Sequence, residues 1–397
     1  MSGLARYVDR LLSFGEPGAH PASAIVAVRT PSGVAVECGG WAAPADGATA
    51  AVPMSRGLLL DLASVTKVAV TTVIVMRLAD EGRLALADLV RDHLPAFSGG
   101  DKDRVTLEHL LTHTAGLQPW WPLYLETTER DAAVLRAQEL PLATAPGTAW
   151  NYSDLGLILA GAVVETVTGL PLRDVYRTLV ADPLGLTSDY GPVPPGSAVT
   201  SADSDAYEFR MVGTGTPYPV PFRTDDFDGW RDRPLRGEVN DGNAAHALAG
   251  VSGHAGLFST VDDLLTLGAA VRGGGFVSGD VLRAFSRPNA INPEQAVGFR
   301  RSTITVDGRS LAVLGHSGFT GTWFGFALDA DVVVAGAAMR LAGTTGGLAD
   351  AADAAAAPRP PLVNPPLVSG DAIQSILLEA AADRLAADSA HNEREER

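Results

Sequence analysis

The positions of the predicted strands along the chain restrict its fold more than any other feature. Apolar runs rich in β-branched residues occur near both chain ends, and the predicted strands are residues 24–29, 34–38, 58–62, 302–306, 310–314, 322–328 and 332–339. Because the segment between the two groups is mostly helical in pattern, the chain has to leave the sheet and return to it. We therefore predict an α/β fold, in which one antiparallel sheet is built from both chain ends, is flanked by helices and carries a mostly helical inserted domain. The predicted sheet domain comprises residues 1–85 and 250–397, and residues 86–249 form the inserted, helical and loop-rich domain.

The predicted helices lie mainly between the two groups of strands. Residues 64–82 contain many β-branched residues, but the length of the segment and its polar end favour a helix. Residues 118–146 and 187–245 are predicted to be loops that shape a pocket, because long loops in compact proteins usually border a site. Residues 343–368, rich in Ala, Pro and Gly, are predicted to be a tether. Further helices are predicted at residues 1–14, 105–117, 151–169, 171–180 and 371–388.

Composition excludes several classes of partner. The net charge of the 397 residues is −16, which disfavours nucleic acids and anionic membranes. The longest apolar run, residues 68–76, is too short to span a bilayer, and the N-terminus does not have the pattern of a secretory signal. We therefore predict a cytoplasmic protein with neither kind of partner; the sequence does not predict its oligomeric state.

Cys38 is the only cysteine, so no internal disulfide is possible, and we expect a buried, inert thiol.

A Ser-x-x-Lys string, Ser64 to Lys67, opens the first long predicted helix. Residues i and i+3 share a helix face, so the lysine amine can reach the serine hydroxyl, which needs a neighbouring base to become a nucleophile. The chain has only two lysines among 30 basic residues, which is consistent with keeping a lysine where a removable proton is needed. Chance is the alternative, because about one chain of this composition in nine would contain such a string.

Two further strings carry candidate chemistry. Tyr152, in Asn151-Tyr152-Ser153-Asp154, follows a Pro-Gly loop and precedes a predicted helix, and a phenol near a lysine can have a lowered pKa and act as a base. The alternative is that Ser153 or Asp154 caps the helix and Tyr152 packs on Trp150. The string from Gly315 to Thr322 enters a predicted strand, where N–H groups can bind an oxyanion, or where glycines merely begin a strand.

The remaining strings carry less chemistry. His109 and His113 have the i,i+4 spacing of metal ligands, but no Glu lies between them, so we expect capping or packing roles. No G-x-S-x-G, phosphate loop or dinucleotide fingerprint occurs. We therefore predict neither a metal nor a cofactor.

In their order along the chain, S-x-x-K at 64–67, Y-x-D at 152–154 and H-x-G at 316–318 resemble the motifs of serine β-lactamases and penicillin-binding proteins. The resemblance is closest to class C β-lactamases and the β-lactamase-like carboxylesterases. It extends from about Ile25 to Met339 and includes two further stretches, residues 110–117 and 253–260. It implies the β-lactamase/transpeptidase-like fold.

The resemblance also implies a role for each motif residue. Ser64 would be the nucleophile, Lys67 its proton partner and Tyr152 the general base of both half-reactions. The backbone N–H groups of Ser64 and Phe319 would form the oxyanion hole. The other residues implied in substrate binding are Asp154, His316, Ser317 and Gly318.

Two departures from the family pattern bear on the substrate, a small-molecule ester or amide. Asp154 replaces the usual Asn, and His316 replaces the strand Lys; both changes weaken recognition of the carboxylate carried by β-lactams and by peptides ending in D-Ala. We therefore predict a serine hydrolase that acts through an acyl-enzyme on Ser64, as a carboxylesterase on small acyl esters. The enzymatic alternatives are a β-lactamase, a D-Ala-D-Ala carboxypeptidase or a D-amino-acid amidase. A different class is a binding or sensor domain that is acylated once or not at all.

Overall fold

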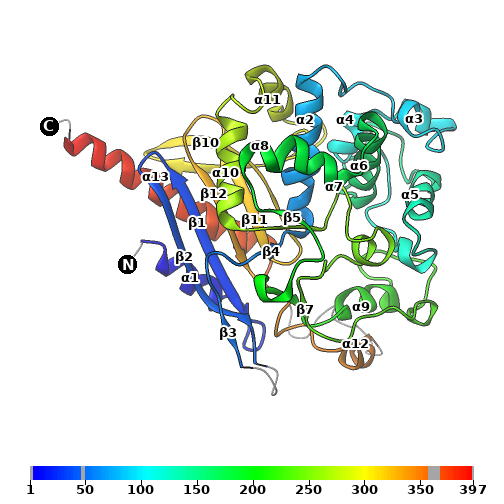
Figure 1. Cartoon of the computed structure of the whole chain (residues 1–397), viewed down its shortest axis with the longest axis horizontal. Helices are drawn as coiled ribbons and strands as arrows, with labels where there is room; N and C mark the ends of the chain where they lie inside the picture. The colour runs from blue at the N-terminus through cyan, green and yellow to red at the C-terminus, as the bar shows by residue number, and fades with distance from the viewer. Residues whose placement is uncertain (1–2, 46–49, 356–366, 396–397) are drawn as a thin grey trace.

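Strands from both chain ends form one sheet in the computed structural model, which describes residues 3–45, 50–355 and 367–395 (Figure 1). Within these residues the sheet has seven strands, in the order β3-β2-β1-β12-β11-β10-β9. β1 pairs antiparallel with β2 on one side and with β12 on the other, where Ala24 lies opposite Ala338. The predicted fold, an antiparallel sheet built from both chain ends, is confirmed. The strands are β1 (Ser23–Thr30), β2 (Gly33–Ala43), β3 (Val52–Pro53), β9 (Arg300–Val306), β10 (Arg309–Ser317), β11 (Thr322–Ala327) and β12 (Val333–Ala338).

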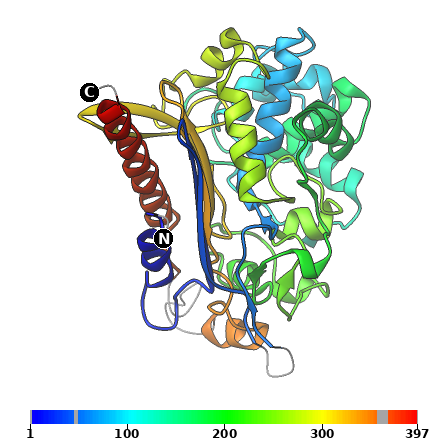
Figure 2. The same cartoon turned by 60° about the vertical axis from the view of Figure 1, so that its left-hand side comes forward.

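Helices cover both faces of this sheet, as the edge-on view in Figure 2 shows. α1 (Ala5–Leu12) and α13 (Gly370–Glu395) pack on one face, and α2 (Val73–Asp80) and α10 (Val261–Arg272) belong to the larger core on the other. Side chains of a strand alternate between the two faces. In β1 the residues that join the α1–α13 core are Ala24, Val26 and Val28, and those that join the larger core are Ile25 and Ala27.

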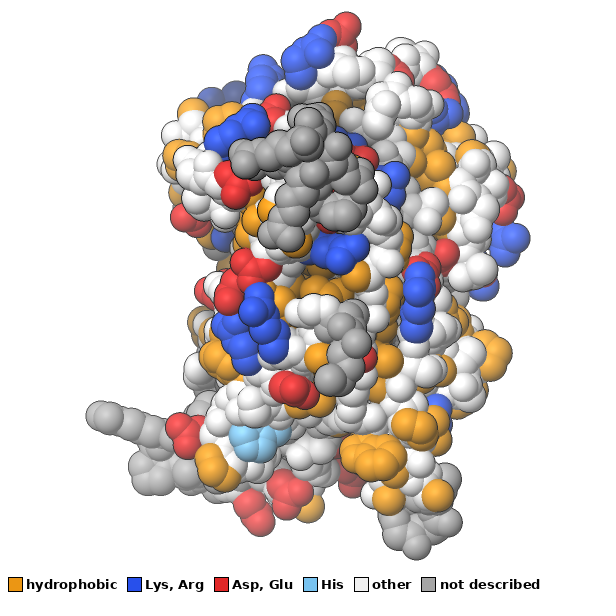
Figure 3. Space-filling model, turned by 90° about the vertical axis from the view of Figure 1, so that its left-hand side faces the viewer, with side chains coloured by type: hydrophobic (Ala, Val, Ile, Leu, Met, Phe, Trp, Pro, Cys, Tyr) orange, Lys and Arg blue, Asp and Glu red, His pale blue; other side chains and the backbone are white. Residues whose placement is uncertain are grey.

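Ion pairs tie the two terminal helices together on the outer face. Arg10 Nη1 lies 2.8 Å from Glu379 Oε2, and Arg6 pairs with Asp383. Figure 3 views this side of the molecule, on which acidic and basic side chains are interspersed. The predicted helices at 1–14 and 371–388 are therefore present, and together they form the outer layer of the sheet.

The predicted helix at 64–82 is continuous in the structure but changes its winding. It comprises a 3-10 turn, η1 (Ala63–Val65), a π-helical stretch, η2 (Lys67–Thr72), and α2. The predicted helix at 105–117 is shorter than expected. α4 (Leu107–Leu111) ends at Leu111, because the left-handed φ of 58° at His113 stops the helix.

The segments that were predicted to be loops contain helices. α5 (Arg130–Glu139) lies within the predicted loop 118–146, and α9 (Ala206–Thr214) lies within 187–245. α12 (Leu348–Ala355) lies within the predicted tether, whose residues 356–366 are outside the described part. Only a few apolar residues of these helices face a core, so their periodicity in the sequence is weak.

Short elements connect the sheet to the helical part. β8 (Leu257–Ser259) pairs with both β4 (Leu60–Asp61) and β5 (Asp189–Tyr190) and so joins segments assigned to the two predicted domains. The division at 85 and 250 stays a prediction. The other elements are α3 (Val90–His93), α6 (Asp154–Thr168), α7 (Leu172–Tyr176), α8 (Asp182–Leu184), α11 (Gly279–Ser286), β6 (Thr200–Ala202) and β7 (Leu235–Arg236).

Among the described residues, no single helix has both the length and the apolar composition to cross a membrane. α6 meets those two criteria only in combination with the segment 172–184, from which it is bent by 76°.

Candidate active site

Ser64 lies in a strained turn at the start of a helix. The residue before it, Ala63, has φ 45°, a left-handed conformation that residues other than glycine rarely adopt. The buried carboxylate of Asp61 holds this turn, because it accepts hydrogen bonds from the backbone N–H groups of Ala63 (2.9 Å) and Asn240 (2.7 Å). Burial raises the pKa of Asp61 to about 6. The turn presents Ser64 at the first turn of a helix, whose free N–H groups favour developing negative charge.

Lys67 is buried directly beside Ser64. Its Nζ lies 2.6 Å from Ser64 Oγ, 2.7 Å from Asp154 Oδ1 and 3.3 Å from the carbonyl oxygen of His254. Burial by itself would lower the pKa of Lys67, but the Asp154 carboxylate and Tyr152 outweigh it and raise the pKa above its ordinary value. The prediction that Lys67 readily gives up a proton is therefore wrong for the resting site, where Lys67 is an ammonium ion.

Tyr152 precedes α6 and lies against both Ser64 and Lys67. The Lys67 Nζ is 5.1 Å from the centre of the Tyr152 ring, and the Tyr152 hydroxyl interacts with both residues. Burial raises the pKa of Tyr152 more than the Lys67 charge lowers it. The prediction of a lowered pKa is therefore wrong. The capping alternative holds for the next residue, because Ser153 Oγ accepts a hydrogen bond from Gly156 N and caps α6.

Two histidines pack against the Tyr152 ring. The ring centroid of His113 is 4.5 Å away and that of His316 is 5.8 Å away. His113 Nδ1 accepts a hydrogen bond from Ser153 N (3.1 Å), which fixes the start of α6. We expected only capping or packing of His113; its packing orients Tyr152. His109 caps α4 through Thr106, as expected.

The loop between β10 and β11 is tied to the turn that presents Ser64. Thr320 Oγ1 donates a hydrogen bond to the carbonyl oxygen of Asp61 (2.8 Å), and Thr322 Oγ1 donates one to that of Leu62 (3.0 Å). Gly318 lies so close that a Cβ built on it would be 2.4 Å from Leu62 O. The next residue, Phe319, has a backbone N–H without a hydrogen-bond acceptor among the described residues. The predicted oxyanion-binding segment therefore lies beside Ser64.

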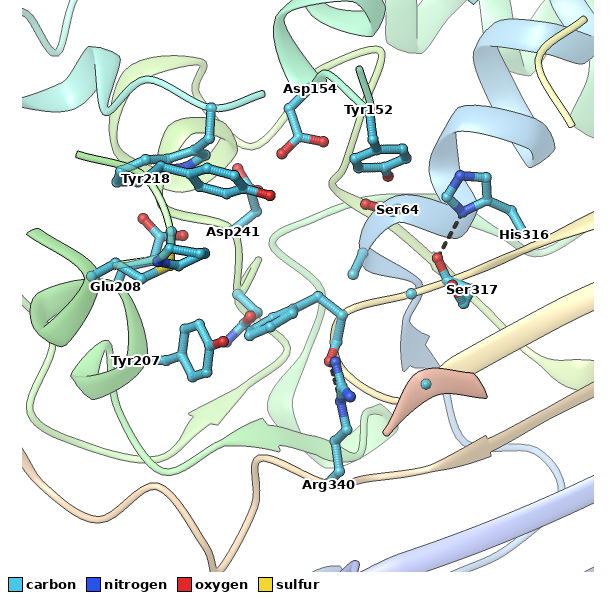
Figure 4. A pocket seen from close by; sticks show the side chains of 18 of the residues that line it. Ser64, Tyr152, Asp154, Tyr207, Glu208, Tyr218, Asp241, His316, Ser317 and Arg340 are labelled. Carbon is cyan, nitrogen blue, oxygen red and sulfur yellow. Dashed lines mark hydrogen bonds between the residues drawn. The ribbon is translucent and has the colours of Figure 1, made fainter. Parts of the chain in front are cut away.

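A pocket of about 400 Å³ opens over Ser64 (Figure 4). All the predicted site residues line it except Lys67, which is buried behind Ser64. The sequence did not single out the aromatic, acidic and basic residues of the other walls, which come from segments far apart in the chain. Among them are Trp120, Tyr207, Glu208, Tyr218, Asp241, Arg300 and Arg340.

A buried polar network supports the wall opposite His316. Glu208 accepts hydrogen bonds from the Tyr124 hydroxyl and from Gly242 N, both at 2.8 Å. Burial raises the pKa of Glu208. Asp241 Oδ1 lies 2.9 Å from His254 Nε2, and the carbonyl oxygen of His254 contacts Lys67. The sequence signals for this network were the family-like stretch 253–260, which contains His254, and the segment 187–245, which was predicted to shape the pocket and contains Glu208 and Asp241.

In the described part of the chain, no group of three or more His, Cys, Asp or Glu residues could hold a metal ion. Cys38 lies in β2, as expected, but it is only half-buried, like its neighbours in this strand. Its Sγ is 3.7 Å from Met54 O.

Comparison with known proteins identifies related chains. The family model described as "Beta-lactamase" matches residues 13–358. The N-acetylmuramyl-L-alanine amidase of Bacillus subtilis (strain 168) is 32% identical over 296 residues, which are 68% of this chain and 65% of the amidase, so the chain spans just under two thirds of that relative. Two solved structures share the fold. "EstCE1, a hydrolase with promiscuous acyltransferase activity" has a TM-score of 0.61 at 23% identity, over 84% of this chain and 93% of its own. The D-amino acid amidase from Ochrobactrum anthropi SV3, complexed with L-phenylalanine amide, has a TM-score of 0.63 at 17% identity, over 87% of this chain and 92% of the amidase.

Proposed function

This chain belongs to the beta-lactamase family, and we propose that it is a serine hydrolase that works through an acyl-enzyme on Ser64. One observation carries the proposal. Ser64 Oγ lies 2.6 Å from Lys67 Nζ at the wall of a pocket, and the Tyr152 hydroxyl interacts with both groups. A serine hydroxyl becomes a nucleophile when a neighbouring group takes its proton, and these contacts supply that neighbour.

The reaction has two half-reactions with one base. Tyr152, as a phenolate beside the Lys67 ammonium, accepts the proton of Ser64 while Ser64 Oγ bonds to the substrate carbonyl carbon. The N–H groups of Ser64 and Phe319 stabilise the oxyanion. Tyr152 then donates the proton to the leaving oxygen or nitrogen as its bond to carbon breaks. In deacylation water takes the place of the leaving group, gives its proton to Tyr152 and releases the acid, and Ser64 regains a proton.

We propose small neutral acyl esters as the substrate class. Trp120, Tyr207, Tyr218 and Phe319 give the pocket aromatic walls, which suit an apolar acyl group. Burial, together with Lys67 and Arg300, lowers the pKa of His316 to about 3, so this strand position offers no charge to a carboxylate. The similarity to EstCE1, named as a hydrolase with acyltransferase activity, is consistent with an ester substrate.

A second candidate is the hydrolysis of carboxylate-bearing amides, such as β-lactams or peptides ending in D-Ala. Arg300 favours this second candidate. Its guanidinium lines the pocket beside His316 and stacks on the ring of Trp150 at 5.1 Å. It has no ion-pair partner among the described residues. An arginine binds a carboxylate with two hydrogen bonds. D-Amino-acid amides, the substrate type of the structural neighbour amidase, extend the test to substrates without a carboxylate.

A substrate panel tests both candidates on purified protein. The panel comprises short p-nitrophenyl esters, nitrocefin, D-Ala-D-Ala peptides and a D-amino-acid amide, with Ser64→Ala as the control. We expect ester turnover that Ser64→Ala abolishes, and a higher kcat/KM for the esters than for nitrocefin. Nitrocefin as the best substrate would replace the esterase proposal by the β-lactamase one. Covalent labelling of Ser64 without any turnover would point instead to a sensor domain.

A further inference from the structure

The Lys67–Asp154 ion pair is the feature that distinguishes this site from the Y-x-N motif. The two atoms are 2.7 Å apart, and the Lys67 and Asp154 side chains are only 1% and 18% exposed. Because both side chains are largely buried, salt screens this pair less than it screens an exposed pair. An Asn at position 154 could place its oxygen beside the lysine, but it could not neutralise the lysine.

The Lys67 ammonium has more acceptors than it has protons to donate. Ser64 Oγ, Asp154 Oδ1, the His254 carbonyl oxygen and the Tyr152 hydroxyl surround its three N–H groups. No lone pair is left to accept the proton of Ser64, so Tyr152 has to do so. A phenol gives up its own proton more readily beside a cation, and less readily when that cation is neutralised.

We propose that Asp154 is a positioning residue that sets the working pH of the site. Paired with Lys67, Asp154 neutralises the positive charge that would otherwise favour ionisation of Tyr152. Tyr152 then becomes a phenolate, and can take the proton of Ser64, only in alkaline solution. This inference rests on the proposed hydrolase function. It assigns to Asp154 a role other than the substrate binding expected from the sequence.

The other ionisable groups around Tyr152 and Lys67 do not take over this role. Burial keeps His113 and His316 neutral, because it lowers the pKa of each well below the ordinary value. Asp241 is paired with His254. Arg300 stacks on Trp150, and Tyr218 is itself buried with a raised pKa. Asp154 is thus the one carboxylate of the described residues in an ion pair with Lys67.

The pH dependence of kcat/KM for p-nitrophenyl acetate, corrected for spontaneous hydrolysis, tests this proposal on the full chain. For the wild type we expect the half-maximal rate to lie above about pH 8. For Asp154→Asn we expect it at least about one pH unit lower, because a negative charge close to the titrating phenol has been removed. Asp154→Glu retains the charge and should lie nearer the wild type. Asp371→Asn is the matched control, since Asp371 also lines the pocket but has no contact with Lys67; it should leave the midpoint in place.

The rate at which a fluorophosphonate labels Ser64, followed by mass spectrometry, gives a second profile that does not need turnover. It should shift in the same direction. A midpoint that stays in place or rises in Asp154→Asn would overturn the proposal, as would equal shifts in Asp154→Asn and Asp371→Asn. If Asp154→Asn does not fold, a wild-type profile that is already flat from about pH 6 to 8 overturns it as well. A wild type that neither labels at Ser64 nor turns over any substrate defeats the proposed function itself.

Discussion

His316 is held in one tautomer by its own neighbour. Its Nδ1 lies 2.7 Å from the Ser317 carbonyl oxygen, which can only accept a hydrogen bond, so the proton is on Nδ1. Its Nε2 is buried and has no partner among the described residues. His316 is therefore neutral and can only accept a hydrogen bond from a substrate, whereas Arg300 is the cation on this side of the pocket.

Arg300→Gln should separate the two candidate substrate classes. Loss of the guanidinium should lower kcat/KM for nitrocefin and for D-Ala-D-Ala peptides about 10-fold or more, the usual loss for a charged hydrogen-bond partner. Uncharged p-nitrophenyl esters should change little, because they have no group for Arg300 to bind. Steady-state kinetics on the same panel measures the ratio. An equal loss for both classes would mean that Arg300 only supports the structure of the pocket.

Lys67→Arg tests whether Lys67 has to exchange protons or only carries a charge. Arginine keeps the charge but neither fits the buried space nor gives up a proton near neutral pH. We expect kcat to fall about 100-fold or more, because the larger guanidinium displaces Ser64 and Tyr152 from their positions in the buried site. Lys102→Arg makes the same change at the other lysine, whose Nζ donates to Gln138 O away from the pocket, and should leave kcat unchanged. Near-normal turnover of a folded Lys67→Arg variant would show that only the charge matters.

At the scale of the elements, the turn that presents Ser64 depends on Asp61. Asparagine at this position has one acceptor oxygen for the two N–H groups that Asp61 binds, those of Ala63 and Asn240. Asp61→Asn should therefore cost about 1–3 kcal/mol of stability and, because Ser64 shifts, lower kcat about 10- to 100-fold. Denaturant unfolding and ester kinetics measure both effects.

A control separates loss of stability from loss of geometry in this experiment. Val334→Ala, in the core between β12 and α13, should destabilise the protein to a similar extent without changing kcat. If Asp61→Asn is less stable but fully active, the turn does not need its carboxylate to position Ser64.

Element prediction succeeded where the local pattern and the tertiary environment agree. β1 and β12 are apolar, buried runs in the middle of the sheet, and α13 has a long regular pattern. It failed for α4, whose end is set by the left-handed backbone of His113, and for α9, a helix within a Gly- and Pro-rich segment. Neither has a strong period in the sequence.

At the scale of the whole molecule, the motifs predicted which residues meet but not their charge states. Ser64, Lys67 and Tyr152 come together because an S-x-x-K helix and the start of α6 face one pocket. The raised pKa of Lys67 and of Tyr152 depends on burial and on the Asp154 ion pair, which are properties of the folded chain. Individual residues of the far wall, such as Glu208 and Arg300, were not predicted, although Glu208 lies in the segment 187–245 that was expected to shape the pocket.

Two buried carboxyl groups, Asp61 and Glu208, make a contribution to stability that is lost as the pH rises, whereas the buried neutral histidines His113 and His316 act in the opposite direction below about pH 6.5. Burial raises the pKa of Asp61 to about 6 and also raises that of Glu208, to which Asp241 contributes. Above about pH 4, the unfolded chain releases the protons of these two groups while the folded protein still holds them, so their contribution to the free energy of unfolding decreases with pH. The decrease continues until Glu208 ionises in the folded state.

Glu208→Gln should reduce this decrease. Glutamine stays neutral and can still accept from Gly242 N, so between about pH 5 and pH 8 the variant should lose about 1–3 kcal/mol less than the wild type. Denaturant unfolding at the two pH values measures the difference. Glu294→Gln removes the same charge from an exposed side chain and should leave the wild-type slope. Equal slopes for Glu208→Gln and the wild type would mean that Glu208 is already ionised in the folded protein, and the pocket would then hold one more negative charge opposite Ser64.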